Sequence, residues 1–234
     1  MAKTLRYAVK HSFPIFISFI PVGLAYGVLM QSVGYNALWA GACSLFVMAG
    51  SLQYLMVSFF AGGVSLATVA VMALLLNSRH IFYGLSFIEK FRSFGPWKYF
   101  LIYSLTDENY SLHCSHHFDE DMNEKWVYVL TAVMPVIYWV VLSVAGAFIG
   151  TLIPFDTTGI DFALTALFIV ILIEQMKGAD NHLPALLAFV SSIVCLIFFG
   201  PSNFILPSLL ITVALLIILR SRIEPVKPEE KEEN

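Results

Sequence analysis

The chain has 234 residues, of which 59% are hydrophobic and 12% are charged, about half the charged fraction of an ordinary soluble domain. Residues 11–78, 126–155 and 181–219 contain no Asp, Glu, Lys or Arg. This composition excludes a water-soluble globular domain. The net charge of −3 gives no basic surface for a nucleic acid, so the expected partners are membrane lipid, a small solute and another membrane subunit.

Long apolar runs predict membrane helices, because a bilayer core needs about 20 helical apolar residues and leaves no water to pair with backbone groups. The predicted fold class is therefore all-α, a polytopic integral membrane helix bundle with about six to seven spans. Segment 99–117 is a weaker candidate that we expect at the interface or packed inside protein, and no internal repeat is obvious. The main candidates are 13–33, 37–61, 64–88, 126–150, 159–176, 183–199 and 204–219.

Basic residues indicate the orientation, since Lys and Arg are retained on the cytoplasmic side of short loops. Three basic clusters, within residues 3–10, 90–98 and 220–231, place the N- and C-termini in the cytoplasm. An even number of crossings must then separate the first two clusters, although three apolar segments lie between them. One segment should therefore not cross.

The first apolar segment is the best candidate for the one that does not cross. It contains Pro14, Pro21, Gly23 and Gly27, and proline and glycine break or weaken a helix. We expect a broken or re-entrant first segment, with a kinked but complete crossing as the alternative. As domains, the sequence indicates a transmembrane domain over 1–220 and a disordered, charged cytoplasmic tail over 221–234.

Arg79 is the most costly polar residue of the predicted bundle. It lies nine residues before the end of its apolar segment, about 13 Å along a helix. Asn77 and His80 are close to it in the sequence, and Tyr83 follows one helical turn after it, so this stretch can present a polar face inward. The alternative is that Arg79 extends to the cytoplasmic headgroups.

Asp107 and Glu108 are two adjacent carboxylates that follow an apolar run. Adjacent residues do not share a helix face, so we expect one of them to pair with Arg79 and the other to face water. Desolvation would raise the pKa of such a carboxyl group and suit it to proton coupling. An acidic loop that continues to Glu124 is the alternative.

Two motifs of small residues and amides complete the predicted site. An interrupted helix over residues 20–27 would expose backbone donors to a substrate carboxylate, while Ser51 and Gln53 could add hydrogen bonds or, for Gln53, simply join helices. Gly23 with Gly27, and Gly146 with Gly150, also form G-x-x-x-G motifs that allow close helix packing. The predicted substrate-binding residues are Pro21, Gly23, Tyr26, Gly27, Ser51, Gln53, Asn77 and Tyr83, and the predicted ion-pair or coupling residues are Arg79, His80, Asp107 and Glu108.

Other chemistry is disfavoured. A helix could bring His113, His116 and His117 to one side, as for zinc, but a solvated loop explains these residues better, and we predict no metal. The three cysteines are expected to be free thiols. No catalytic triad, nucleotide-binding loop or dinucleotide fingerprint occurs, so we expect neither an enzyme nor a cofactor.

Four motifs together resemble the AzlC family, the large subunits of two-component branched-chain amino acid exporters. The motifs are IPVGLAYG at 20–27, MAGSLQY at 48–54, LNSRHIFYG at 76–84 and LTDENYS at 105–111. They occur in the order and approximate spacing of the family, and the resemblance spans about residues 13–219. Departures at Ser51–Leu52 and at residues 109–111 affect the expected choice of substrate and leave membership unaffected.

The resemblance implies export of leucine, isoleucine and valine across the bacterial cytoplasmic membrane, together with a small hydrophobic membrane partner of the AzlD type. Because the chain has no nucleotide-binding motif, a proton-driven secondary mechanism is the economical expectation. In this interpretation the substrate carboxylate binds near residues 21–27, and its ammonium binds Asp107 or Glu108 with Tyr83 or Tyr26. The alternatives are a non-transporting membrane subunit and a channel for a small solute.

Overall fold

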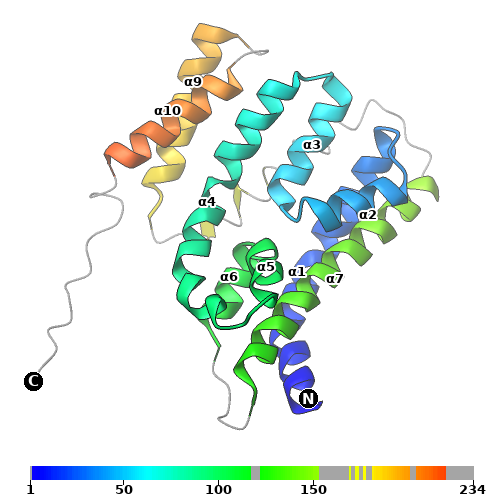
Figure 1. Cartoon of the computed structure of the whole chain (residues 1–234). Helices are drawn as coiled ribbons and strands as arrows, with labels where there is room; N and C mark the ends of the chain where they lie inside the picture. The colour runs from blue at the N-terminus through cyan, green and yellow to red at the C-terminus, as the bar shows by residue number, and fades with distance from the viewer. Residues whose placement is uncertain are drawn as a thin grey trace, which may run out of the picture. The chain divides into compact units, whose positions relative to one another are not determined.

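The computed structural model describes residues 2–116, 122–152, 169, 172–173, 176–177, 181–200 and 204–219. All regular secondary structure within these ranges is α-helical (Figure 1), which confirms the predicted all-α class. The chain forms two compact units, residues 1–164 and 165–234. The predicted tail over 221–234 and most of the predicted segment 159–176 lie outside the described residues.

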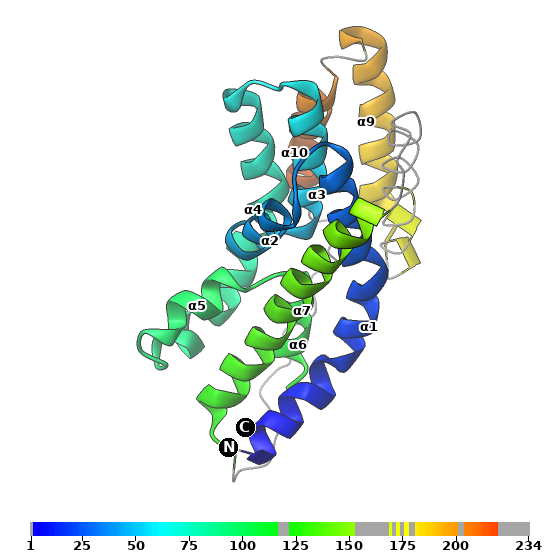
Figure 2. The ribbon, with the colours of Figure 1, turned by 90° about the vertical axis from the view of Figure 1, so that its right-hand side faces the viewer.

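Helix α1 (Ala2–Ser32) runs without interruption through Pro14 and Pro21. The prediction of a broken first segment is therefore wrong. A proline removes one backbone hydrogen bond, but membrane helices tolerate this when neighbouring helices surround the affected turn. α1 has such a neighbour, because it lies beside α7 (Glu124–Leu152) over much of its length, as Figures 1 and 2 show.

Glycines allow α1 and α7 to approach closely. A Cβ atom on Gly27 would overlap backbone atoms of Ser143 and Ala147, and one on Gly146 would overlap the backbone of Leu24. A Cβ atom on Gly23 would lie 2.8 Å from the Leu142 Cβ atom. The two G-x-x-x-G motifs thus form the packing contact between these helices.

The predicted apolar segment 37–61 is divided into α2 (Ala37–Phe46) and α3 (Gly50–Gly62). The Asn36 side chain caps α2 by accepting a hydrogen bond from the Leu38 amide at 3.1 Å. Between the two helices, Met48 has a φ of 44°, which is uncommon for a residue with a side chain. The interruption that the sequence predicts in α1 therefore occurs between α2 and α3.

Helix α4 (Leu66–Arg92) is followed by two short helices, α5 (Trp97–Tyr103) and α6 (Asp107–Cys114). The weaker candidate segment 99–117 thus contains a second interruption. Leu101 in α5 and Asn109 in α6 have no exposed surface, whereas Tyr99 and Ile102 are exposed, so one side of this segment packs inside protein. Phe87 and Phe91 of α4 and Tyr128 of α7 belong to the core around it.

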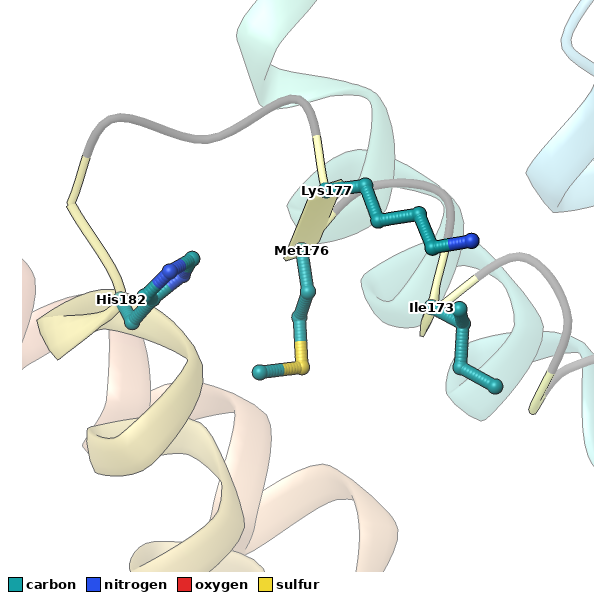
Figure 3. A pocket seen from close by; sticks show the side chains of 4 residues that line it. All are labelled: Ile173, Met176, Lys177 and His182. Carbon is teal, nitrogen blue, oxygen red and sulfur yellow. The ribbon is translucent and has the colours of Figure 1, made fainter.

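In the C-terminal unit, α9 (Leu183–Phe199) packs against α10 (Ile205–Ile218). Ser191 and Thr212 join the two helices by a hydrogen bond between their hydroxyls. The same unit has an open depression of about 440 Å³ that is lined by Ile173, Met176, Lys177 and His182 (Figure 3). No predicted site residue lines it.

Among the described residues, three helices are long and apolar enough to cross a bilayer: Lys3–Ser32, Leu66–Arg92 and Glu124–Leu152. The other apolar helices of the described residues have 10–17 residues, and the predicted segment 159–176 lies mostly outside the described residues. Large apolar side chains lie on the outside of these helices, including Leu74 and Phe82 of α4 and Phe148 of α7. Such surfaces suit a lipid environment.

Candidate functional site

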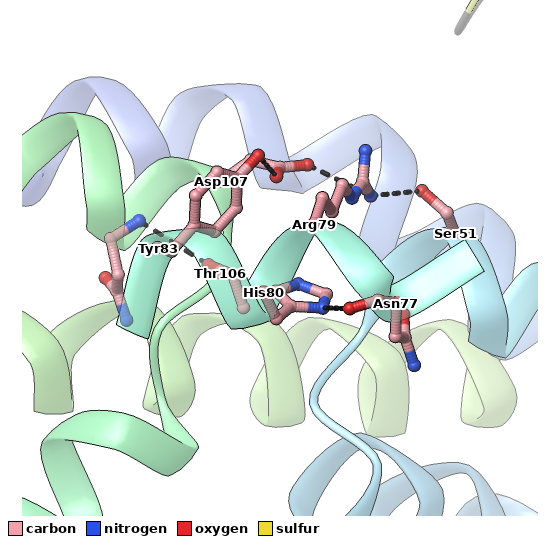
Figure 4. A network of polar contacts seen from close by, with 8 residues as sticks. Ser51, Asn77, Arg79, His80, Tyr83, Thr106 and Asp107 are labelled. Atoms are coloured by element: carbon pink, nitrogen blue, oxygen red, sulfur yellow. Dashed lines mark hydrogen bonds and ion pairs between the residues drawn. The ribbon is translucent and has the colours of Figure 1, made fainter. Parts of the chain in front are cut away.

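Arg79 joins three helices of the N-terminal unit. From α4, its Nη2 atom lies 3.1 Å from the Asp107 Oδ2 atom of α6 and donates a hydrogen bond of 3.2 Å to the Ser51 hydroxyl of α3 (Figure 4). The Arg79 and Asp107 side chains are 34% and 41% exposed. The sequence predicts a carboxylate partner for Arg79, and the structure places Asp107 in that position.

Tyr83 completes this polar network. One turn after Arg79 on α4, its hydroxyl donates a hydrogen bond of 2.6 Å to the second carboxylate oxygen of Asp107. Its ring stacks on Tyr110 of α6 at a centroid distance of 4.5 Å. Both oxygens of Asp107 thus have a donor from α4, which fixes the first turn of α6 against that helix.

The start of α6 favours a carboxylate at this position. Thr106 is the N-cap, and its hydroxyl accepts a hydrogen bond from the Asn109 amide at 3.5 Å. Asp107 and Glu108 occupy the first turn, where the partial positive charge of the helix stabilises acidic groups. Ser51 has a similar place in the first turn of α3, so two helix starts meet at Arg79.

Glu108 differs from its neighbour Asp107. It makes no ion pair within the described residues that involves Arg79, and burial raises the pKa of its carboxyl group. Two adjacent carboxylates therefore have different environments, one in an ion pair with Arg79 and one outside it. Both residues are half-buried, so the expectation that the second carboxylate faces water stays a prediction.

Asn77 and His80 lie on the same helix as Arg79 but do not join the ion pair. The His80 Nδ1 atom lies 3.2 Å from the Asn77 backbone oxygen, and the His80 ring contacts Tyr83 edge to face. The Arg79 Nε atom and the Asn77 side-chain oxygen are buried and have no hydrogen-bond partner in the described part of the chain. Buried polar atoms usually have a partner, so both atoms have unused bonding capacity.

Gln53 and Tyr26 form a second cluster. The Gln53 amide, which is fully buried, donates to the Ser44 hydroxyl at 3.1 Å and accepts from the Trp139 indole at 2.8 Å. The Tyr26 ring packs against Trp139 and Tyr54. Gln53 thus ties α3 to α2 and α7, as expected if it joins helices. Its partners Ser44 and Trp139 were not predicted, and the only available signal was that a buried indole N–H needs an acceptor.

Pro21, Gly23 and Gly27 lie inside continuous α1, and the two glycines pack against α7. Their segment has no interruption that would free backbone donors. The reason for expecting a substrate carboxylate at these three residues is therefore removed.

His113 and His116 pack against each other and against α7, so the expected solvated loop is wrong at His113. His113 is 2% exposed, and its Nδ1 atom lies 3.3 Å from the Nε2 atom of His116. The same His116 atom lies 3.1 Å from the Thr131 hydroxyl of α7. His117 lies outside the described residues, and no group suited to a metal occurs among those that the structure describes.

These features define a helical membrane protein with a polar site built from one arginine and one carboxylate. The family model described as AzlC protein matches residues 14–153, which include every predicted site residue. The chain is 34% identical to the branched-chain amino acid transport protein AzlC of Bacillus subtilis, with 94% of this chain and 86% of that protein covered. The chain therefore belongs to the AzlC family.

Two other relatives are named as membrane proteins. An uncharacterized membrane protein of Helicobacter pylori is 32% identical, with 95% of this chain and 97% of that protein covered. The inner membrane protein YgaZ of Escherichia coli is 28% identical, with 76% of each chain covered. No solved structure matches the chain.

Proposed function

We propose that this protein is a secondary transporter that exports branched-chain amino acids across the bacterial cytoplasmic membrane. The observation that carries the proposal is the partly exposed ion pair of Arg79 and Asp107, held between α3, α4 and α6. The name of the Bacillus subtilis relative supports amino acid transport. The name of the Escherichia coli relative supports the inner membrane.

The ion pair matches the two charges of an amino acid. The substrate carboxylate would bind Arg79, whose Nε atom has no partner in the described structure, together with the Ser51 hydroxyl. The ammonium would bind Asp107, with Tyr83 as a neighbouring group. A zwitterion placed in this way replaces the direct contact between Arg79 and Asp107, so neither charge loses its partner when the substrate enters.

Proton coupling would use a group that changes charge during transport. Glu108 is suited to this role because burial raises the pKa of its carboxyl group, and it directly follows the substrate-binding carboxylate. His80, whose ring contacts Tyr83 edge to face, is the second predicted coupling group. Both termini would lie in the cytoplasm, since a basic cluster lies near each end of the chain, within residues 3–10 and 220–231.

A small hydrophobic membrane subunit of the AzlD type would complete the exporter. The outer faces of α4 and α7 offer apolar side chains for such a partner, including Leu74, Phe82 and Phe148. Copurification from membranes that contain both chains tests this association.

Leucine counterflow in proteoliposomes tests the transport function. The protein is reconstituted with and without the small partner, and with and without a pH gradient. Saturable exchange that is lost in the Arg79→Ala variant is expected. A flux that rises linearly with leucine concentration would instead indicate a channel, and no flux even with the partner would indicate a non-transporting subunit.

A further inference from the structure

Two parts of the N-terminal unit resemble each other in sequence once the structure shows where to align them. α1 and α4 are both long helices, and each is followed by a glycine with positive φ, Gly34 at 89° and Gly95 at 64°. These glycines lie 61 positions apart, and the same offset aligns further residues. The pairs are Ile20 with Ile81, Gly23 with Gly84, Leu24 with Leu85, Ala25 with Ser86, Tyr26 with Phe87, and Ser32 with Ser93.

The elements that follow the two glycines also correspond. Each glycine leads into a short helix, an interruption and a second short helix, α2 and α3 in the first part and α5 and α6 in the second. After each interruption comes a fully buried amide followed by a tyrosine, Gln53–Tyr54 and Asn109–Tyr110. Two residues before each amide is a partner of the Arg79 Nη2 atom, Ser51 in one part and Asp107 in the other.

The buried amides make equivalent contacts. Each one donates across its own interruption to the last serine of the preceding region, Gln53 to the Ser44 hydroxyl and Asn109 to the Ser104 backbone oxygen. Ser44 and Ser104 are each followed by a leucine and are both fully buried. In each half, therefore, a buried side-chain amide donates a hydrogen bond to a serine that precedes it, to the side-chain hydroxyl in the first half and to the backbone oxygen in the second.

The tyrosines repeat the pattern in a third way. Tyr54 packs edge to face on Tyr26 at 5.7 Å and 79°, and Tyr110 packs on Phe87 at 5.7 Å and 84°. Tyr26 and Phe87 are an aligned pair at the 61-residue offset. The aligned sequence positions and the ring contacts are independent observations, and they agree.

The two parts run in opposite directions. Figures 1 and 2 show that α1 runs away from the end of the unit that holds the N-terminus, and that α4 runs back toward that end. Basic residues lie at the start of α1, with Lys3 and Arg6, and at the end of α4, with Lys90 and Arg92. If α1 and α4 each cross the membrane once and both basic ends are cytoplasmic, the intervening α2 and α3 must together cross an even number of times. With 10 and 13 residues, each is too short to cross alone, since a crossing needs about 20 residues.

We propose that residues 11–62 and 72–114 form an inverted internal repeat. In each half, a crossing helix is followed by a re-entrant helical hairpin, and the two hairpins, α2–α3 and α5–α6, enter the membrane from opposite faces. Their interruptions meet on either side of Arg79. This proposal agrees with the expectation that one apolar segment before Lys90 does not cross the membrane. The segment that does not cross is α2–α3, and α1 crosses.

The repeat has one functional asymmetry. The residue aligned with Arg79 is Ser18, whose hydroxyl donates a hydrogen bond to the Ile15 backbone oxygen of its own helix. The second half thus supplies the arginine, and each half supplies one of its partners. A single substrate site per chain follows. A gating role for the hairpins rests on the proposed transport function. In that role, the two hairpins open the substrate site to opposite sides of the membrane in turn.

Cysteine labelling tests the topology without any transport measurement. The native Cys43, Cys114 and Cys195 are first replaced by serine, and a membrane-impermeant maleimide is applied to intact and to permeabilised cells that express the full chain. Tyr35→Cys and Val64→Cys, at the two ends of the first hairpin, should both react in intact cells. Ser93→Cys and Asn123→Cys, which flank the second hairpin, should react only after permeabilisation. Reaction of Tyr35→Cys and Val64→Cys from opposite faces would overturn the inverted repeat.

A second labelling experiment tests the gates in reconstituted protein that exchanges leucine. Ala49→Cys and Leu105→Cys lie at the two interruptions and are buried in the described structure. Leucine supplied from one side should raise the labelling rate of one cysteine and lower that of the other. If leucine changes the two labelling rates in the same direction, or changes neither, in protein that exchanges leucine, the gating role is overturned. Absence of exchange would count against the proposed function and leave the topology result unaffected.

Discussion

Arg79 is held by groups from two other helices, so its replacement should affect both substrate binding and the local structure. Arg79→Ala leaves the Asp107 carboxylate without its ion-pair partner and should lower leucine exchange by at least about tenfold, since hydrogen bonds to charged groups contribute about 1.5–3 kcal/mol. Counterflow at several leucine concentrations measures the loss. Lys90→Ala is the matched control. Its ion pair with Glu124 is also solvent-exposed but lies in the last turn of α4, and it should matter little.

Exchanging the charges of Arg79 and Asp107 distinguishes a loss of their ion pair from a loss of either side chain alone. Arg79→Asp alone places two carboxylates together and should reduce the yield of folded protein, measured by fluorescence-detected size-exclusion chromatography. Adding Asp107→Arg should restore that yield at least in part. If the double variant is as poorly folded as the worse single variant, the two side chains do not pair in the membrane.

The Tyr83 hydroxyl should contribute less to leucine binding than Arg79 does. Tyr83→Phe removes the donor to Asp107 and keeps the ring that stacks on Tyr110. A hydrogen bond to a charged carboxylate contributes about 1.5 kcal/mol at the lower end of its range, so we expect the KM for leucine to rise by about tenfold with folding intact. Tyr110→Phe, which keeps the same ring stack and leaves Asp107 untouched, should have a normal KM. Equal effects of the two variants would contradict a role of the Tyr83 hydroxyl in binding.

The residues of the ion pair could be predicted because a charge among apolar residues needs a partner, and few candidates exist in this chain. The cluster of Ser44, Gln53 and Trp139 could not, because it joins residues that lie 86 positions apart. Nothing in the local pattern around Trp139 distinguishes an indole that donates to an amide from one that faces lipid. The hydrophobic pattern of a sequence does not indicate which uncharged side chains, far apart in the chain, form hydrogen bonds with each other.

At the scale of elements, glycine has a different role at each position. Gly27 faces the backbone of α7, whereas Gly84 has no atom near the position of an added Cβ. Gly27→Ala should therefore force α1 and α7 apart and cost about 1–3 kcal/mol, as overpacking does. Gly84→Ala should leave stability unchanged or raise it by up to about 1 kcal/mol through helix propensity. Thermal unfolding in detergent compares the two, and a similar drop for both would refute the tight contact.

The helix interruptions show where sequence reasoning was limited. Prolines predicted an interruption in α1, but packing against α7 keeps that helix continuous. The actual interruption at Met48 contains no proline, and the bonds that stabilise it come from the Gln53 side chain and from Trp139 on another helix. The second interruption could have been found, because Thr106 followed by two acidic residues is a recognisable helix start.

At the scale of the whole molecule, the basic clusters predict one non-crossing segment between Lys10 and Lys90. This topology stays a prediction. Internal similarity could not be found by reading along the chain, because the aligned residues are sparse and the first hairpin is longer than the second. The buried amides and their tyrosines become comparable only when the helix boundaries are known.

The stability of the N-terminal unit should depend on pH through the histidine cluster, which connects α1, α6 and α7. Burial lowers the pKa of His113 to about 3 and that of His116 to about 4, from an ordinary value of 6.5. Neighbouring imidazoles add to this effect, because a proton on His113 would be repelled by one on His116, and a proton on His116 by one on His11. Tyr128 of α7, which contacts both rings, provides no compensating charge at neutral pH.

The sign of the pH effect follows from proton binding. Between pH 6.5 and about 4 the unfolded chain binds protons that the folded chain excludes, so stability that is present at neutral pH is lost as the pH falls through this window. The midpoint of thermal unfolding in detergent should therefore fall between about pH 7 and about pH 5. A variant with His113→Gln and His116→Gln should show a smaller fall, whereas His182→Gln, an exposed histidine of the C-terminal unit, should behave like the unmodified chain. An equal fall in the double variant would assign the pH dependence to other groups.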